Sequence, residues 1–269
     1  MNANTILVVS HRRSGTHWTM DAIRHNHASV GESYLNLDRL LPWHESPISI
    51  SHFKSLLAAQ QGAFLIKTHA PPTLEPFGVD TGLLRYVQSL VAESDLVYVY
   101  RDGRDVLVSL YYYMRHYDPG MREVSFSDFI RMESQFDAIP ASEHRLNRVE
   151  YWKFHVEGWL KQSAMSKVSY EDLHANYEAV VKVLATRLGR ETAADIKSVD
   201  FRSSKYPSSK LHRLALGMVR MIRSRSSGTS SAILPRKGVI GEWRRHFSHQ
   251  DISFFNSIAG ELLQELGYL

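Results

Sequence analysis

Cysteine does not occur in this sequence of 269 residues, which rules out disulfide bonds and thiolate chemistry. Long apolar runs are missing as well, and none reaches the ~18–20 residues that a membrane-spanning helix needs. The residues before the first apolar run lack the cationic region and the apolar core of a signal peptide. These absences predict a cytoplasmic protein without membrane contact.

A Walker A loop is also lacking, because no G-x-x-x-x-G-K-[ST] spacing occurs in the chain. Metal-assisted ATP chemistry is therefore disfavoured. Positive charge is in excess, with 32 Lys and Arg against 28 Asp and Glu and a pI near 9.2, which suits an anionic ligand without identifying it. The length fits a single α/β domain that spans residues 1–269 and buries a full core.

Short apolar runs alternate with amphipathic stretches along the chain. This alternation of predicted strands and helices is typical of a central, mostly parallel sheet flanked by helices. Ligands of such sheets bind at the carboxyl ends of the strands. The predicted strands are Ile6–Val9, Ala63–Ile66, Leu96–Tyr100 and Lys167–Ser169. The predicted helices are about Trp18–His25, Phe53–Gln60, Leu83–Ala92, Val106–Tyr117, Val149–Gln162, Tyr177–Leu188 and Asp251–Leu266.

Two of the predicted strands lead into basic turns that are followed by helices. The strand Leu96–Tyr100 leads to Arg101, whose planar guanidinium can hold a phosphate, and the hydroxyl of Ser109 follows in the next helix. The strand Ile6–Val9 leads to a basic, hydroxyl-rich loop at residues 12–16. Because backbone N–H groups at a helix N-terminus converge with the cations of this loop, we expect a P-loop-like phosphate site there.

The segment at residues 10–18, S-H-R-R-S-G-T-H-W, resembles the 5′-phosphosulfate loop of the sulfotransferases that use 3′-phosphoadenylyl sulfate (PAPS), usually written T-Y-P-K-S-G-T-x-W. Other motifs of that family occur in the same order and extend the resemblance over most of the chain. They are K-T-H at 67–69, R-D-G-R-D-V-L-V-S at 101–109, W-K-F-H-V-E-G-W at 152–159, Y-E-D-L at 170–173 and R-K-G-V-I-G-E-W at 236–243.

This resemblance implies a PAPS-dependent sulfotransferase that releases PAP and requires no metal. Trp18 and Phe201 match positions that sandwich the adenine, Tyr170 matches a contact to its edge, and the motif at 236–238 matches the segment that closes over the 3′-phosphate. The implied donor-binding residues are Arg12, Arg13, Ser14, Gly15, Thr16, His17, Trp18, Arg101, Ser109, Tyr170, Phe201, Arg236, Lys237 and Gly238.

Three residues are the expected catalytic set. His69 follows an apolar strand, and an imidazole can remove a proton from an acceptor hydroxyl at neutral pH. Lys67 would neutralise charge on the oxygen that leaves with PAP. Arg13 stands where the family usually has lysine, and Arg12 stands where it has proline.

Residues 202–235 are rich in Ser and basic side chains, which predicts a mobile surface loop on the acceptor side. A basic amphipathic helix at Leu211–Ile222 that contacts a membrane or a partner is the alternative. The dimer motif of the family would fall on Arg244–Ser253, but its Val and Glu are missing, so the oligomeric state stays open.

The expected function is sulfuryl transfer to a hydroxyl or amine of a small-molecule acceptor, with no nucleic acid as partner. The sequence does not name the acceptor. Two alternatives stay open from the residues alone. One is a P-loop-like nucleotide kinase, and the other is a non-catalytic nucleotide-binding or membrane-surface module on the same fold.

Overall fold

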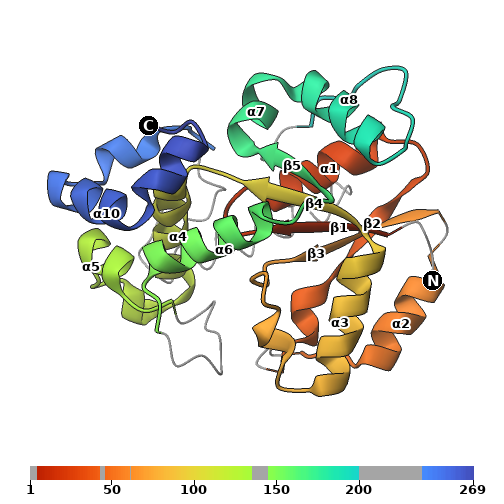
Figure 1. The fold of residues 1–269 in the computed structure, drawn as a ribbon, viewed down its shortest axis with the longest axis horizontal. Helices are drawn as coiled ribbons and strands as arrows, with labels where there is room; N and C mark the ends of the chain where they lie inside the picture. Colours follow the sequence, from red (N-terminus) through yellow and green to blue (C-terminus); the bar gives the residue numbers. More distant parts are fainter. Residues whose placement is uncertain (1–4, 43–45, 61, 135–144, 200–237) are drawn as a thin grey trace, which may run out of the picture.

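The computed structural model describes residues 5–42, 46–60, 62–134, 145–199 and 238–269. Five parallel strands form one sheet in the order β2-β3-β1-β4-β5 (Figure 1). Their bounds are β1 Thr5–Ser10, β2 Val30–Asn36, β3 Ala63–Thr68, β4 Asp95–Tyr100 and β5 Met165–Ser169. The predicted α/β domain with a parallel sheet flanked by helices is confirmed.

Helices cover both faces of the sheet. The α-helices are α1 Thr16–Asn26, α2 Ile50–Ala58, α3 Thr81–Glu93, α4 Gly103–Tyr117, α5 Phe126–Arg131, α6 Arg148–Leu160, α7 Tyr170–Ala175, α8 Tyr177–Arg187 and α10 His249–Glu265. Short 3₁₀ turns add η1 Leu37–Leu40, η2 Glu75–Phe77, η3 Pro119–Met121 and η4 Glu242–Arg245. Figure 1 shows α1, α7 and α8 on one side of the sheet and α2 and α3 on the other.

The two sides of the sheet bury separate apolar cores. In β1, Ile6 and Val8 belong to the core beneath α1, α7 and α8, whereas Leu7 and Val9 belong to the core shared with α3, α4, α6 and α10. All four side chains are fully buried. Because successive side chains of a strand point to opposite faces, a continuous apolar run is what a central strand between two helical layers requires. β1 is therefore fixed in register on both faces.

The four predicted strands and the seven predicted helices are all present, with ends that differ by a few residues. The strand β2 was missed, because its sequence V-G-E-S-Y-L-N is not apolar. It lies at the sheet edge and pairs only with β3, with an irregular register between Val30 and Tyr34. The short helices α5 and α7 were also missed. Ser169 is both the last residue of β5 and the N-cap of α7, so no loop separates the two.

No helix in the described ranges is long and apolar enough to cross a bilayer. The predicted mobile loop at 202–235, with its alternative helix at Leu211–Ile222, lies outside the described residues.

Candidate active site

The predicted site residues follow the carboxyl ends of four neighbouring strands. The β1–α1 loop follows Ser10, His69 follows β3, Arg101 follows β4, and Tyr170 follows β5. In a parallel sheet these ends lie at one edge, where ligands of open α/β sheets bind. The β1–α1 loop, His69, Arg101 and Tyr170 thus all lie at this one edge of the sheet.

The β1–α1 loop turns sharply before the first turn of α1. Arg13 and Gly15 have left-handed backbones, with φ of 72° and 101°. The hydroxyls of Ser10 and Thr16 are joined by a hydrogen bond of 2.5 Å across the loop. Ser14 is fully buried, and its Oγ has no hydrogen-bond partner among the described residues. A buried hydroxyl beside a helix N-terminus and basic side chains fits an anionic ligand.

Gly15 is required by the close approach of Tyr170. A Cβ at this position would lie 2.6 Å from Cδ2 of the Tyr170 ring, closer than two carbon atoms that are not bonded to each other can approach. The ring of Trp18 lies 5.5 Å from that of Tyr170, and its Nε1 donates to the carbonyl of Val199 at 2.6 Å. Trp18 is nearly buried. Trp18 and Tyr170, two of the residues predicted to contact the adenine, therefore pack against each other.

His69 is held by the last residue of β1 and by Lys67. Its Nδ1 lies 2.9 Å from the carbonyl oxygen of Ser10, and because a carbonyl only accepts, Nδ1 carries the proton. Lys67 Nζ then donates to the unprotonated Nε2 at 3.2 Å. Burial lowers the pKa of His69 well below its usual 6.5, and the positive charges of Lys67 and Arg12 act in the same direction. The ring is therefore neutral at pH 7, with its lone pair on Nε2.

Lys67 is buried. Burial lowers the pKa of its ammonium group, whereas the carboxylate of Asp38 raises it. The same carboxylate holds the backbone after β3, because its Oδ1 accepts from His69 N at 2.9 Å and from Thr68 Oγ1 at 2.8 Å. Asp38 was not predicted from the sequence. It lies in η1 after the edge strand β2, and no motif spacing connects it to residue 69.

The helix α6 supports the same turn from the other side. His155 Nε2 donates to the carbonyl of His69 at 3.2 Å, and Tyr98 donates to His155 Nδ1 at 3.0 Å. Trp159 Nε1 donates to the carbonyl of Ala70 at 3.0 Å. Burial lowers the pKa of His155 well below 6.5, so it stays neutral and keeps this pattern of donors. These side chains hold the backbone of the turn that carries His69.

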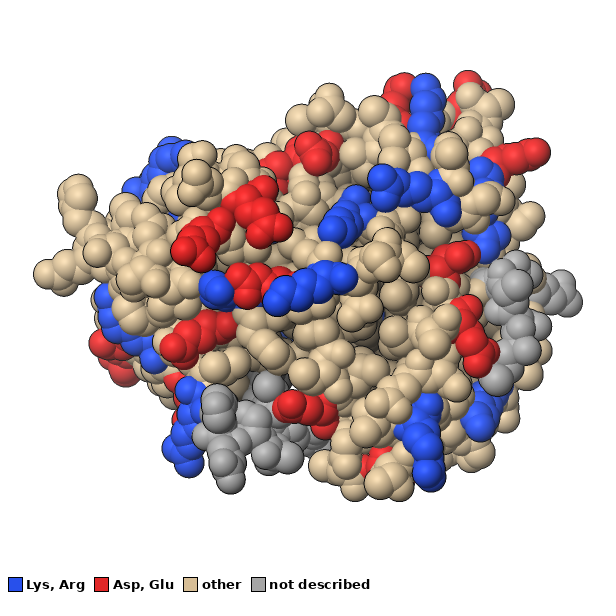
Figure 2. Space-filling model, viewed as in Figure 1, with Lys and Arg blue, Asp and Glu red and all other residues tan. Residues whose placement is uncertain are grey.

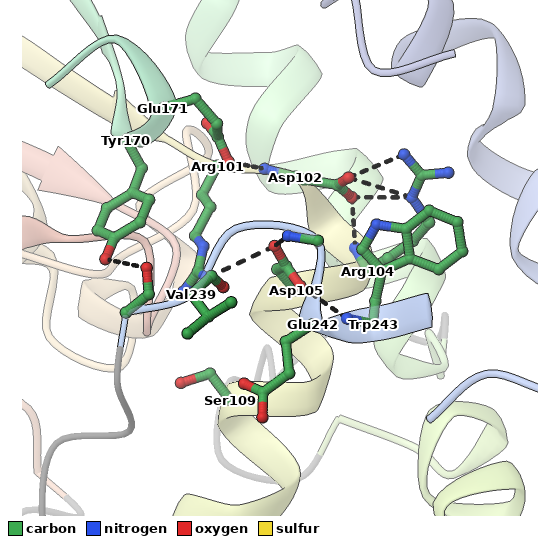
Figure 3. Close-up of polar contacts among 12 residues, drawn as sticks. Arg101, Asp102, Arg104, Asp105, Ser109, Tyr170, Glu171, Val239, Glu242 and Trp243 are labelled. Atoms are coloured by element: carbon green, nitrogen blue, oxygen red, sulfur yellow. Dashed lines mark hydrogen bonds and ion pairs between the residues drawn. The ribbon is translucent and has the colours of Figure 1, made fainter. Parts of the chain in front are cut away.

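Figure 3 shows how the segment after residue 237 is attached to β4, α4 and α7. Arg101 donates to the carbonyl of Val239 at 2.9 Å, and Tyr170 donates to that of Gly238 at 3.0 Å. Asp105, in the first turn of α4, accepts from Gly241 N at 2.7 Å and from Trp243 N at 2.9 Å. The described part of the motif at 236–243 therefore contacts the 101–109 segment.

Arg101 is buried and lies over the ring of Tyr170, with its guanidinium carbon 4.3 Å from the ring centre. Its Nε has no hydrogen-bond partner within the described ranges. Such a donor is costly to leave unpaired. It therefore fits the predicted contact with an anion.

Arg13 reaches across to α4. Its Nε donates to Ser109 Oγ at 3.1 Å, and its guanidinium carbon lies 5.0 Å from the ring centre of Tyr113. Arg13 and Ser109, which the sequence assigned to two different parts of the donor site, are thus in direct contact. The aromatic ring of Tyr113 adds a cation–π contact that was not predicted.

The remaining predicted residues fall into two groups. The ring of His17 lies 5.5 Å from that of Tyr34. Phe201, Arg236 and Lys237 lie outside the described residues. Among the described residues, no group of three or more His, Asp or Glu side chains could hold a metal ion.

Comparison with known proteins gives one family. The family model for the sulfotransferase domain matches residues 3–267. Sulfotransferase 2B1 of Rattus norvegicus is 24% identical over 271 residues, which cover 97% of this chain and 71% of the relative. Sulfotransferase 2A1 of Homo sapiens is 21% identical over 267 residues, which cover 97% of this chain and 85% of the relative.

Solved structures show the same fold. The crystal structure of mouse sulfotransferase SULT7A1 complexed with PAP gives a TM-score of 0.59 at 19% identity and covers 98% of this chain and 86% of that chain. The crystal structure of retinol dehydratase in complex with androsterone and the inactive cofactor PAP gives a TM-score of 0.56 at 19% identity. The match covers 98% of this chain and 81% of that chain.

Proposed function

The chain belongs to the sulfotransferase family, and from this premise we propose that it transfers the sulfuryl group of PAPS to a hydroxyl or amine of a small molecule. The observation that carries the proposal is the meeting, at one sheet edge, of the β1–α1 loop, the Lys67–His69 pair and the Arg101–Ser109 segment. PAPS as donor is supported by the PAP named in the solved relatives.

The donor is bound by the residues that follow β1, β4 and β5. The N–H groups at the start of α1, the buried hydroxyl of Ser14 and the side chain of Arg13 receive the 5′-phosphosulfate. Arg101 and Ser109 receive the 3′-phosphate, and the unpaired Nε of Arg101 among the described residues supports this. The other predicted donor residues complete the site in this proposal, and they are Arg12, Gly15, Thr16, His17, Trp18, Tyr170, Phe201, Arg236, Lys237 and Gly238.

His69 acts as the general base. Its Nε2 lone pair accepts the proton of the acceptor hydroxyl while the hydroxyl oxygen bonds to sulfur and the bond from sulfur to the bridging oxygen breaks. The Nδ1–H bond to the Ser10 carbonyl keeps the ring in the tautomer that this step needs. An acceptor hydroxyl must take the place of Lys67 at Nε2, which frees the Lys67 ammonium for the bridging oxygen.

We also propose that residues 1–269 form one sulfotransferase domain, in which residues 202–235 belong to the acceptor side. Acceptor specificity is not fixed by the family, because two similar proteins carry different substrates in their names, a 3-alpha-hydroxysteroid sulfotransferase of Cavia porcellus and a retinol dehydratase.

The proposal is tested with PAPS and a panel of phenols, alcohols and amines, with PAP release and product mass as readouts. We expect His69→Ala to lower kcat by roughly 10²–10⁴, the usual contribution of a general base, and to leave PAP affinity unchanged. His52→Ala, at an exposed histidine of α2, is the matched control and should retain full turnover.

PAP should stabilise the protein against heat more than ADP, which lacks the 3′-phosphate, does. At 100 times Kd the expected gain is about 2.7 kcal/mol, or several degrees in Tm. Equal shifts with PAP and ADP would contradict the 3′-phosphate assignment. Full turnover in His69→Ala would remove that residue from the role of base.

A further inference from the structure

A closed network of hydrogen bonds joins the ends of β4 and β5 to the turn that follows α10. Tyr268 Oη donates to Glu171 Oε2 at 2.7 Å, and Glu171 Oε1 accepts from the backbone N–H of Asp102 at 3.3 Å. The carboxylate of Asp102 pairs with Arg104 at 2.8 Å, and Arg104 donates to the carbonyl of Tyr268 at 2.8 Å. Figure 3 shows the part of this network that Glu171, Asp102 and Arg104 form.

The turn after α10 directs Tyr268 toward this network. Gly267 has a left-handed backbone with φ of 76°, and its N–H donates to the carbonyl of Gln264 at 3.1 Å. The N–H of Tyr268 donates to the carbonyl of Leu263 at 2.8 Å. These are the two hydrogen bonds of a Schellman motif, which reverses the chain at the end of a helix. The position of Tyr268 is therefore set by its backbone as well as by its side chain.

Two members of the network directly follow proposed ligands of the donor. Asp102 follows Arg101, to which we assign the 3′-phosphate. Glu171 follows Tyr170, which matches a contact to the adenine. The guanidinium carbon of Arg101 lies 4.3 Å from the centre of the Tyr170 ring. The hydrogen bond between Asp102 and Glu171 therefore holds the backbone beside one ligand against the side chain that follows the other.

The part of the network formed by Asp102 and Arg104 is buried. The guanidinium carbon of Arg104 lies 3.9 Å from the centre of the Trp243 ring. Buried charges keep one geometry only where further hydrogen bonds satisfy them. Tyr268 supplies two such bonds, because its carbonyl accepts from Arg104 and its hydroxyl donates to Glu171. Without the hydroxyl, the carboxylate of Glu171 is held less firmly against Asp102.

We propose that Tyr268 is a positioning residue for the donor. Through Glu171 it fixes the backbone after β4, and thereby the position of Arg101 relative to Tyr170. This inference rests on the proposed function, in which Arg101 and Tyr170 bind PAPS. Tyr268 lies outside the motifs that carry the family resemblance, the last of which ends at residue 243.

The test is Tyr268→Phe, which removes the hydroxyl and keeps the carbonyl that accepts from Arg104. We expect the Kd of PAP, measured by calorimetry, to rise by roughly threefold to tenfold, because a hydrogen bond to a charged group is lost outside direct contact with the ligand. With PAPS and an acceptor from the panel, the KM for PAPS should rise as well. The value of kcat should stay within roughly twofold of wild type, because Lys67 and His69 lie on the β3 side of the sheet.

Tyr111→Phe is the matched control, because it also removes the hydroxyl of a tyrosine that donates to a backbone carbonyl or carboxylate. Tyr111 is buried in α4, and its Oη donates to the carbonyl of Val124 at 2.8 Å. The control should lower Tm and leave the Kd of PAP unchanged. A role of Tyr268 in stability alone predicts this same pattern for Tyr268→Phe.

A double-mutant cycle with Glu171→Gln tests the path of the effect. Glu171→Gln removes the charge that accepts from Tyr268 and should also weaken PAP binding. If Tyr268 acts through Glu171, the double variant loses less PAP affinity than the product of the two single losses. Glu171→Gln also tests the network where Tyr268→Phe does not fold, and a wild-type Kd of PAP in Glu171→Gln then overturns the inference.

Three outcomes overturn this inference and leave the proposed function in place. The Kd of PAP changes by less than roughly threefold in Tyr268→Phe, or it rises as much in Tyr111→Phe, or the two single losses multiply in the double variant. If the wild type binds no PAP, the proposed function and this inference fail together. If it binds PAP but transfers sulfate to no acceptor, the proposed transfer fails, and calorimetry still decides the role of Tyr268.

Discussion

At His69, two hydrogen bonds decide which ring nitrogen can act as a base. The Ser10 carbonyl accepts a hydrogen bond from Nδ1–H, and Nε2 accepts one from Lys67. Burial and the neighbouring cations keep the ring neutral, so the base is available without help from a carboxylate. In this arrangement Asp38 acts on the backbone of His69 and on the charge of Lys67, not on the imidazole.

Two substitutions separate these roles of Asp38. Asp38→Asn keeps an acceptor oxygen for Thr68 Oγ1 and His69 N but removes the charge that raises the pKa of Lys67. The pKa of Lys67 should therefore fall further, and the basic limb of the kcat–pH profile should move to lower pH. Asp38→Ala also releases the turn, and we expect kcat to fall by roughly tenfold to hundredfold because the base is displaced.

The measurement is the kcat–pH profile of both variants beside the wild type. A profile of Asp38→Asn with an unmoved basic limb would show that Asp38 does not control the charge of Lys67. If Asp38→Ala and Asp38→Asn give the same kcat at every pH, the hydrogen bonds from Thr68 and His69 to Asp38 do not contribute to catalysis.

Sequence motifs predicted the residues that we propose to contact the substrates, but they did not predict the residues that position those side chains. Lys67 and His69 belong to a three-residue motif with fixed spacing. Asp38 contacts this turn from η1, which follows β2, and Tyr98 of β4 acts on it through His155, so their positions depend on the order of the strands in the sheet. That order is set by how the helices pack, and a single sequence does not reveal it.

At the scale of the elements, α4 connects the proposed donor site to the C-terminal part of the chain. Asp105 in its first turn accepts the N–H groups of Gly241 and Trp243 and lies 3.5 Å from the guanidinium of Arg101 (Figure 3). Burial raises the pKa of this carboxyl, and Arg101 opposes that effect. One side chain thus fixes both the η4 turn and a predicted phosphate ligand.

We expect Asp105→Ala to destabilise the fold and to weaken PAP binding. Two backbone N–H groups lose their acceptor, which costs about 1–3 kcal/mol, or several degrees in Tm. Arg101 loses its ion-pair partner, so its orientation toward the 3′-phosphate is less fixed. Thermal unfolding and calorimetric titration with PAP measure the two effects.

Asp80→Ala is the matched control, because Asp80 also accepts two backbone N–H groups, those of Gly82 and Leu83, at the exposed start of α3. It should cost about 1 kcal/mol and leave PAP affinity unchanged. Equal PAP affinity in Asp105→Ala and wild type would mean that α4 does not hold the donor site through this residue.

The elements themselves were largely predictable where periodicity was strong. The central strands β1, β3 and β4 are continuous apolar runs because both of their faces are buried. The edge strand β2 has one neighbour and tolerates Gly31 and polar residues, so its sequence carries no such signal. Gly189 ends α8, since it adopts φ of 60° there and Arg190 N donates back to the Ala185 carbonyl at 2.9 Å.

For the whole molecule, the excess of positive charge is not a surface patch on the face shown in Figure 2. Basic and acidic side chains are interspersed there, without a continuous area of one sign. Two of the cations in the proposed site, Lys67 and Arg101, are each only 7% exposed. A basic pI is compatible with an anionic ligand, but these two cations are buried at the sheet edge and contribute little to the outer surface.

Three histidines whose pKa is lowered in the folded protein make the stability of the whole molecule sensitive to acid. Burial lowers the pKa of His27, His69 and His155 below the usual 6.5. As pH falls through 6.5, the unfolded chain binds protons that the folded chain does not, so stability is lost. Each such proton contributes about 1.4 kcal/mol per pH unit.

Asp21 has the opposite effect on the pH dependence of stability. Burial raises its pKa to about 6, so the folded chain binds the extra proton and gains stability as pH falls below that value. The histidine effect should therefore be clearest near pH 7, where this carboxyl is still mostly ionised, and it should be partly offset as pH approaches 6.

Urea unfolding at half-unit steps from pH 7.5 to 6.0 measures this loss. We expect the free energy of unfolding of the wild type to fall as pH falls. In His155→Gln the slope against pH should be smaller, by at most the equivalent of one bound proton, because glutamine can still donate to the His69 carbonyl but does not titrate. His27→Gln, which removes a buried histidine whose Nε2 lies 3.1 Å from the Val181 carbonyl, should flatten the slope in the same way. A wild-type stability that is constant or rises as pH falls from 7 to 6 would show that these histidines do not stay neutral in the folded protein.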